Sequence, residues 1–188
     1  MTLWSPKPTD MVDIRVACPS IQIELRYETN RNGVGSAVYP MGSRCLLRRG
    51  SAERLSRVQI HLEKLGFGLK IWDAYRPVSA QKALWAVKPD PRFVAPPIRG
   101  SRHNRGAAID LTLVDREGRE LPMPSGFDEF SRRAKPTYSG GTSASRKNRD
   151  TLRSAMMREG FFPDKNEWWH FNDPDWPKYR IINVPLRR

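Results

Sequence analysis

Residues 101–114 read SRHNRGAAIDLTLV, and residues 107–114 of this stretch predict a strand. Apolar side chains alternate along it with small or polar ones, so Ile109 and Leu111 share a face that is expected to pack into the core. Asp110 then stands as a lone carboxylate on a face of small residues. That face leaves room for a metal ion and a substrate.

The loop before this strand supplies a second candidate ligand. His103 lies just ahead of Gly106, a residue type that permits a sharp turn. Such a turn could bring His103 back beside Asp110. Taken alone, a loop histidine and a strand-edge aspartate fit a purely structural role equally well.

A further segment, EWWH at residues 167–170, completes a set of metal ligands. The chain has three histidines, and two of them are His103 and His170. With Asp110 they form the two-imidazole, one-carboxylate set that holds a catalytic zinc ion and leaves one position for water. Glu167 is the candidate general base for that water.

The spacing within the EWWH segment leaves its geometry open. Residues three apart in a flat strand face opposite sides. Glu167 and His170 can therefore share a site only if the segment bends or if Glu167 precedes the strand. Trp168 and Trp169 are expected in the core, with the alternative that one of them forms a wall of the pocket.

Arg76 is the candidate partner for the negative charge that develops on a carbonyl oxygen during hydrolysis. It follows a strand predicted at residues 67–75, and a guanidinium stays charged and donates in a fixed fork. Spacing alone favours a different role for Arg76, in a surface ion pair with Asp73.

Size and composition predict a single soluble domain that spans residues 1–188, with a loose N-terminal arm at 1–15 and a C-terminal tail at 176–188. No apolar run approaches the roughly 20 residues of a membrane span, so no membrane partner is expected. Cys18 and Cys45 are too few for a disulfide framework and are interpreted as ordinary thiols.

The chain is strongly basic, with a net charge of +13. Residues 132–149 carry six basic side chains and no acidic one, but they show no nucleic-acid-binding motif. We therefore expect a solvated basic face and no specific nucleic-acid partner.

No secretory signal is visible, which predicts a cytoplasmic location, or a periplasmic one if a signal has been trimmed away. The oligomeric state is left open.

Strands and helices alternate without a regular βαβ rhythm, which favours the α+β class. A strand is predicted at residues 21–27. Helices are predicted from Ser51, as a cap, to Gly66, and over residues 145–159. The expected architecture is a small antiparallel sheet flanked by helices.

Three blocks of this sequence together resemble the signature blocks of the zinc D-alanyl-D-alanine dipeptidases, a family that includes the vancomycin-resistance dipeptidases. The blocks are DAYRP at residues 73–77, SxHxxGxAxD at residues 101–110, and ExWH at residues 167–170. A stretch at residues 44–48, RCLLR, is also similar. The resemblance covers residues 20–175 approximately.

This resemblance implies a fold shared with D,D-carboxypeptidases and the Hedgehog signalling domain. It implies one zinc ion per chain, with Glu167 as the base and Arg76 as the partner of the oxyanion. Ser101 resembles a residue that helps to hold the carboxylate of a small dipeptide substrate. Asp128 resembles an acid that grips the free amine, and Tyr27 resembles a tyrosine near the substrate.

The sequence departs from the family pattern at two places. Asn32 is followed by Gly33 where the family usually has an aromatic residue, and Pro124-Ser125-Gly126 stands where Gly-Thr is expected. Both changes bear on substrate choice. The leading hypothesis is hydrolysis of D-Ala-D-Ala in cell-wall metabolism. The alternatives are a D,D-carboxypeptidase or endopeptidase that acts on peptidoglycan peptides, and a non-catalytic basic binding module.

Overall fold

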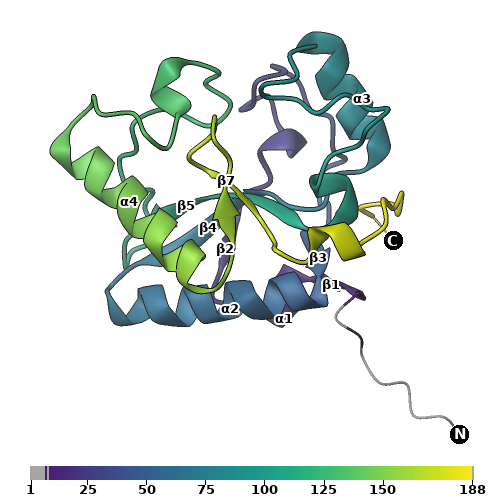
Figure 1. The fold of residues 1–188 in the computed structure, drawn as a ribbon. Helices are drawn as coiled ribbons and strands as arrows, with labels where there is room; N and C mark the ends of the chain where they lie inside the picture. The colour runs from purple at the N-terminus through teal and green to yellow at the C-terminus, as the bar shows by residue number, and fades with distance from the viewer. Residues whose placement is uncertain (1–6, 8, 188) are drawn as a thin grey trace, which may run out of the picture.

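The structure is a computed structural model, and it describes residue 7 and residues 9–187 (Figure 1). The strands are β1 (Met11–Asp13), β2 (Gln22–Ile23), β3 (Leu46–Arg48), β4 (Gly68–Asp73), β5 (Ala108–Val114), β6 (Phe162–Pro163) and β7 (His170–Asn172). The α-helices are α1 (Ile14–Ala17), α2 (Arg49–Lys64), α3 (Val78–Val87) and α4 (Ser143–Arg158). Short 3-10 helices are η1 (Arg26–Glu28), η2 (His103–Arg105), η3 (Arg132–Ala134) and η4 (Trp176–Lys178). Among the described residues, none of the helices has the length and apolar character needed to cross a bilayer.

The fold is α+β, as the sequence predicted. The main sheet has the strand order β2-β4-β5-β7-β6, and β1 pairs with β3 in a second, two-stranded sheet. Neighbouring strands of the main sheet run antiparallel except β2 and β4, which run parallel. The parallel pair arises because α2 lies between these two strands in the sequence and carries the chain back to the same end of the sheet.

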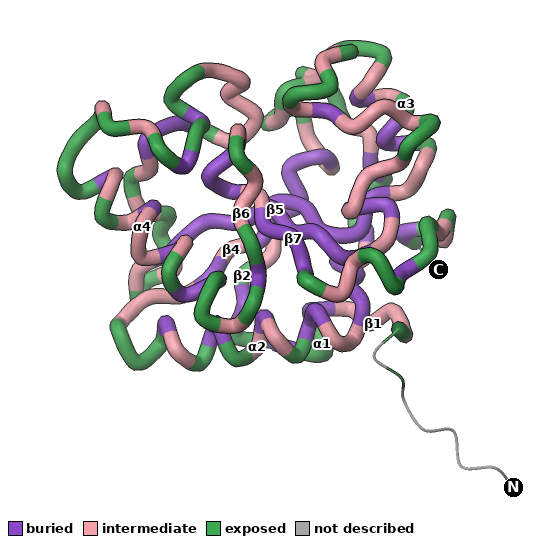
Figure 2. The backbone as a smooth tube through the Cα atoms, viewed as in Figure 1, coloured by how far each residue is buried: buried purple, intermediate pink, exposed green. Residues whose placement is uncertain are grey.

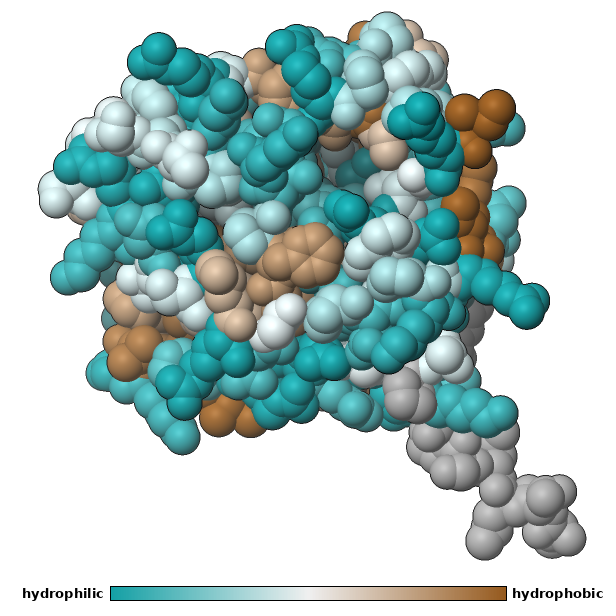
Figure 3. Space-filling view, in the orientation of Figure 1, coloured by the Kyte–Doolittle hydropathy of each residue, from teal (hydrophilic) through white to brown (hydrophobic). Residues whose placement is uncertain are grey.

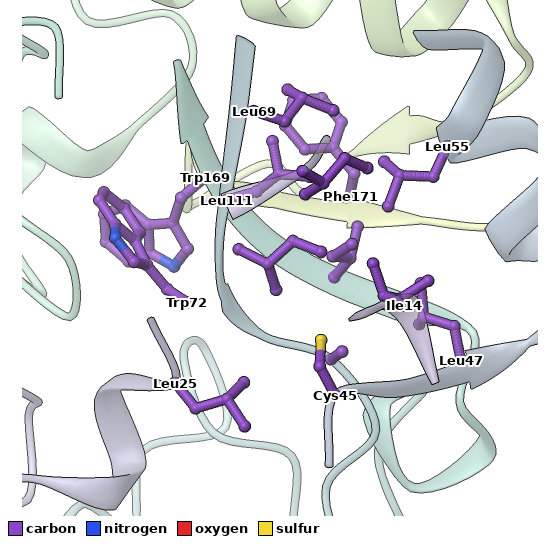
Figure 4. Close-up of a cluster of buried hydrophobic side chains, with 14 of the residues drawn as sticks. Ile14, Leu25, Cys45, Leu47, Leu55, Leu69, Trp72, Leu111, Trp169 and Phe171 are labelled. Atoms are coloured by element: carbon purple, nitrogen blue, oxygen red, sulfur yellow. The ribbon is translucent and has the colours of Figure 1, made fainter. Parts of the chain in front are cut away.

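Helix α2 covers one face of the main sheet, below it in Figure 1, and packs against β4 and α4. Its apolar stripe, which includes Leu55 and Leu62, is fully buried. Figure 4 shows Leu55 with Leu69 and Phe171, apart from Trp169. Each such side chain contributes roughly 1.5–3 kcal/mol to folding when it is removed from water. Figure 2 shows the central strands as a buried strip surrounded by exposed loops.

Helix α2 begins earlier than the sequence predicted. It starts at Arg49 rather than after a cap at Ser51, and Ser51 is buried within its first turn. The cause is a tertiary contact, because the backbone N–H of Arg49 donates to the carbonyl of Asp10 at 2.7 Å. The strand predicted at residues 21–27 is also shorter and gives way to η1, in which Tyr27 turns into the core.

The prediction of a loose arm over residues 1–15 was wrong for its last part. Residues 11–13 form β1 and pair with β3, and Ile14 is fully buried at the start of α1. This pairing joins segments far apart in the chain, which is why local pattern did not reveal it. Residues 1–6 and 8 of the predicted arm lie outside the described residues.

The tail predicted at residues 176–188 packs against the domain as far as residue 187. Tyr179 and Leu186 are buried in it. The hydroxyl of Tyr75 accepts a hydrogen bond from the backbone N–H of Val184 at 2.9 Å. Arg44 donates to the carbonyls of residues 185 and 186. These contacts hold the segment beside Tyr75 and Arg44.

The basic segment at residues 132–149 is mostly surface. Arg132, Arg133, Lys135 and Lys147 are exposed, in keeping with the predicted solvated face. Arg149 is different, because it is buried and donates through Nη1 to the carbonyl of Tyr138. The face of the molecule in Figure 3 is largely hydrophilic, and its hydrophobic atoms lie in small separate groups.

Candidate metal centre and active site

Three side chains that the sequence marked as ligands converge in the structure. The register of β5 and β7 places Asp110 directly opposite His170, and η2 brings His103 to the same point. One ligand atom from each residue lies within 4.8 Å of the other two. The closest pair joins Asp110 Oδ1 to His170 Nδ1 at 2.9 Å. The sequence-based hypothesis that these residues lie together is therefore correct.

The second ring nitrogen of each histidine has a partner of its own. His103 Nδ1 lies 2.6 Å from the carbonyl oxygen of Ala74, and His170 Nε2 lies 2.9 Å from Asn172 Oδ1. Both partners are oxygen acceptors, so each of these nitrogens carries the proton. In the neutral imidazoles that bind a metal, His103 Nε2 and His170 Nδ1 then carry the lone pairs, and these two atoms lie 3.2 Å apart. This is how outer partners orient the imidazole ligands of a metal.

The electrostatics of the cluster favour a positive charge at its centre. Burial opposes ionisation of Asp110, but the two nearby imidazoles outweigh it and hold the pKa of Asp110 below its ordinary value. Burial likewise opposes protonation of His170, yet its hydrogen bond to Asp110 raises the pKa of His170 to about 9. Two facing lone pairs and a carboxylate need a shared proton or a cation between them. The cluster thus suits a metal ion.

The face of β5 that carries Asp110 is less open than its small side chains suggested. Every residue of β5 is buried, because this strand is the middle one of five and is covered on both faces. The space around Asp110 is confined to the end of the strand, where η2 and β7 meet it.

Glu167 shares the site because it precedes β7, which was one of the two arrangements left open by the sequence. A turn closes from the backbone N–H of His170 to the carbonyl of Glu167 at 3.4 Å. Glu167 Oε2 lies 3.9 Å from His170 Nδ1. Burial raises the pKa of Glu167 well above its ordinary value. Trp168 and Trp169, each 1% exposed, pack in the core as expected.

Arg76 is buried, and its predicted pairing with Asp73 is present, although in the interior rather than at the surface. Its Nε and Nη2 donate to Asp73 Oδ2 at 2.9 and 2.7 Å. Its Nη1 donates to Gln81 Oε1 at 3.0 Å. Arg76 Nη2 also lies 3.7 Å from Asp110 Oδ2. Arg76 can therefore pair with Asp73 and still lie beside the metal-ligand cluster.

A cavity of about 450 Å³ lies over this cluster. The eight site residues predicted from the sequence all line this cavity, namely Tyr27, Arg76, Ser101, His103, Asp110, Asp128, Glu167 and His170. A cavity of this size falls in the range of small-molecule sites. The structure thus gathers residues from five separate segments of the chain around one space.

Asp128 and Tyr27 contact one another at the cavity wall. The hydroxyl of Tyr27 and the backbone N–H of Gly33 donate to Asp128 Oδ2 at 3.0 and 2.9 Å. Burial raises the pKa of Asp128 to about 7. A Cβ at residue 33 would come within 2.9 Å of Asp128 Cβ, so this departure from the family pattern allows the close approach. Ser101 Oγ accepts from the backbone N–H of His103 at 3.2 Å.

The family model described as D-ala-D-ala dipeptidase matches residues 7–185 of this chain. The chain belongs to this family. A D-alanyl-D-alanine dipeptidase of Escherichia coli is 39% identical over 93% of this chain and 90% of that protein. One of Enterococcus faecalis is 34% identical over 88% of each. A weaker likeness, with a TM-score of 0.44 and 18% identity over 71% of this chain and 75% of the other, exists to a mutant vancomycin-resistance D,D-pentapeptidase crystallised with Zn(II).

Three supporting residues of this dipeptidase family member were not predicted from its sequence. Asn172 orients His170, Gln81 binds Arg76, and Tyr39 donates to Asp73 Oδ1 at 2.6 Å. Asn172 could have been found, because residues two apart in a strand share a face. Nothing local in the sequence marks Gln81 or Tyr39, since their partners are set by tertiary packing.

Proposed function

We propose that this protein hydrolyses D-alanyl-D-alanine to two molecules of D-alanine, with one zinc ion held by His103, Asp110 and His170. Membership of the dipeptidase family supports the reaction. The observation that carries the proposal is the convergence of these three side chains beside Glu167 in one buried cavity.

The ligand set fits zinc. Two neutral imidazoles and one carboxylate suit this ion, and they leave a coordination position open. The bound ion would act as a Lewis acid and would lower the pKa of a water molecule to about 7. The hydrogen bonds from His103 to Ala74 and from His170 to Asn172 would keep the ligand nitrogens in the required tautomers.

Glu167 is the proposed general base. Its carboxylate takes a proton from the attacking water and passes it to the leaving amine as the amide C–N bond breaks. The position of Glu167 Oε2, 3.9 Å from His170 Nδ1, supports this role. Its burial keeps the carboxylate poorly solvated, which makes it a stronger base toward a proton close by.

Arg76 is the proposed partner of the negative charge on the carbonyl oxygen. Because Asp73 and Gln81 hold its guanidinium in place, no reorganisation is needed as that charge develops. Its Nη2 already lies 3.7 Å from a metal-ligand oxygen of Asp110, which supports a position next to the reacting carbonyl.

Recognition of both charged ends would restrict the substrate to a dipeptide. We assign Asp128, supported by Tyr27, to the free amine and Ser101 to the terminal carboxylate. A longer peptide would place an uncharged amide where a charged end is expected, and an unpaired buried charge is costly.

Incubation of the zinc-loaded protein with three peptides tests the function. The peptides are D-Ala-D-Ala, L-Ala-L-Ala and a pentapeptide that ends in D-Ala-D-Ala, and the free alanine released is measured. Release from D-Ala-D-Ala alone is expected. Release of D-Ala mainly from the pentapeptide would instead identify a D,D-carboxypeptidase. A Glu167→Gln variant, loaded with zinc, is the control for contaminating activity.

A further inference from the structure

The cavity over the metal-ligand cluster has an apolar side that the proposed mechanism does not use. This side is formed by one loop and by a ring from another segment, namely Pro91, Phe93, Val94, Ala95, Pro96 and Phe130. The cavity measures about 450 Å³, and pockets of this size enclose drug-sized ligands. Alanyl-alanine carries only a methyl group on each residue. The cavity therefore has room for a substrate with a larger side chain.

Phe93 and Phe130 form an aromatic pair on this side of the cavity. Their ring centroids lie 4.9 Å apart, and the ring planes are inclined by 39°. Both residues line the cavity and are only half-buried, so ring surface remains in contact with the solvent that fills it. An apolar group placed against these rings would remove that surface from water, which is favourable.

The Phe130 ring is held in the wall by its neighbours. The Nζ atom of Lys88 lies 5.6 Å from the ring centroid, a distance at which a cation–π contact is favourable. Gly33 provides the space for the ring, because a Cβ on residue 33 would lie only 2.9 Å from Phe130 Cε2. The aromatic ring at this corner of the cavity therefore comes from residue 130, and residue 33 contributes backbone alone.

Phe130 lies next to Asp128, the residue assigned to the free amine of the substrate. The same Cβ position on residue 33 is 3.2 Å from Asp128 Oδ2, so the ring edge and the carboxylate oxygen flank one point. The first residue of a dipeptide carries its amine and its side chain on the same carbon atom. An amine bound by Asp128 therefore brings that side chain close to the aromatic pair.

We propose that Phe93 and Phe130 form a subsite for the side chain of the amino-terminal residue. The substrate class is then D,D-dipeptides whose first residue is a larger apolar amino acid, such as D-leucine, as well as D-alanine. This inference rests on the proposed dipeptidase function, because it names further substrates of that same site. One methylene group in a hydrophobic pocket changes kcat/KM by about 10- to 200-fold, so the side chain of D-leucine gives a measurable effect.

The test measures kcat/KM of the zinc-loaded protein for D-Leu-D-Ala and for D-Ala-D-Ala. The value for D-Leu-D-Ala is expected to be at least equal to that for D-Ala-D-Ala. Phe130→Ala should lower the ratio of the two values by about tenfold or more, chiefly through a higher KM for D-Leu-D-Ala. Phe93→Ala, in the facing loop, should lower the ratio in the same direction.

Phe67→Ala is the matched control, because Phe67 is also half-buried but does not line the cavity. It should leave the ratio unchanged. Zinc content and thermal unfolding of each variant show whether the metal site and the fold are retained. A purely structural role of the aromatic pair would change kcat/KM for both peptides by the same factor.

Two results would overturn the subsite. One is a parent protein that cleaves D-Ala-D-Ala but has a lower kcat/KM for D-Leu-D-Ala. The other is an unchanged ratio in the folded, zinc-containing Phe130→Ala and Phe93→Ala variants. A parent protein inactive toward both peptides would instead refute the proposed function, which is a separate outcome.

Discussion

Replacement of Asn172 by Leu should weaken zinc binding without altering any ligand. Asn172 is 1% exposed, and its Oδ1 accepts the hydrogen bond from His170 Nε2 at 2.9 Å. Leu has a similar volume but no acceptor. The Nε2–H of His170 then loses its partner, and the ring is no longer held with Nδ1 toward Asp110.

The expected loss follows from the cost of that single contact. A buried donor left without an acceptor costs about 1–3 kcal/mol, and outer partners of histidine ligands typically contribute about 10- to 100-fold in metal affinity. The two values agree, because a tenfold change in a dissociation constant corresponds to about 1.4 kcal/mol. We therefore expect the zinc dissociation constant of Asn172→Leu to rise by about 10- to 100-fold.

Competition with a chromogenic zinc chelator measures this constant, and circular dichroism checks the fold. Asn172→Asp is the matched control, because it keeps an oxygen acceptor at the same place and should bind zinc at least as tightly as the parent. If Asn172→Leu is folded and binds zinc as tightly as the parent, the assigned orientation of His170 is wrong.

Other substitutions test the remaining roles. Glu167→Ala should retain zinc by elemental analysis and lose turnover; substantial residual activity would refute its assignment as base. Arg76→Ala should lower kcat by about 10²- to 10³-fold, whereas a change in KM alone would move Arg76 to substrate binding. His103→Ala should release the metal, and full zinc occupancy would contradict its role as ligand. Burial raises the pKa of Asp128 to about 7, so the folded protein binds a proton there that the unfolded chain releases near pH 4. The free energy of unfolding should therefore fall as the pH rises from 4 to 7. Asp128→Asn should reduce this dependence on pH, as measured by chemical denaturation.

The sequence by itself determined the class of the fold and the chemistry of the site. The alternation along residues 107–114 predicted β5, and the helical spacing after residue 51 predicted most of α2. The histidines pointed to a metal site because the chain has only three of them, and two lie in segments that also carry acids. Side-chain periodicity is a local property, and for this reason these features were readable without a structure.

Only the tertiary structure decided how the pieces meet. The register of β5 and β7 set Asp110 opposite His170, and the turn before β7 placed Glu167 on the same side. The tertiary structure also shows that the pair of Arg76 with Asp73, expected at the surface, is buried. Part of the expected loose arm forms β1. Each of these outcomes depends on contacts between residues distant in the chain. Such contacts follow from which surfaces can be buried together, which no single segment encodes.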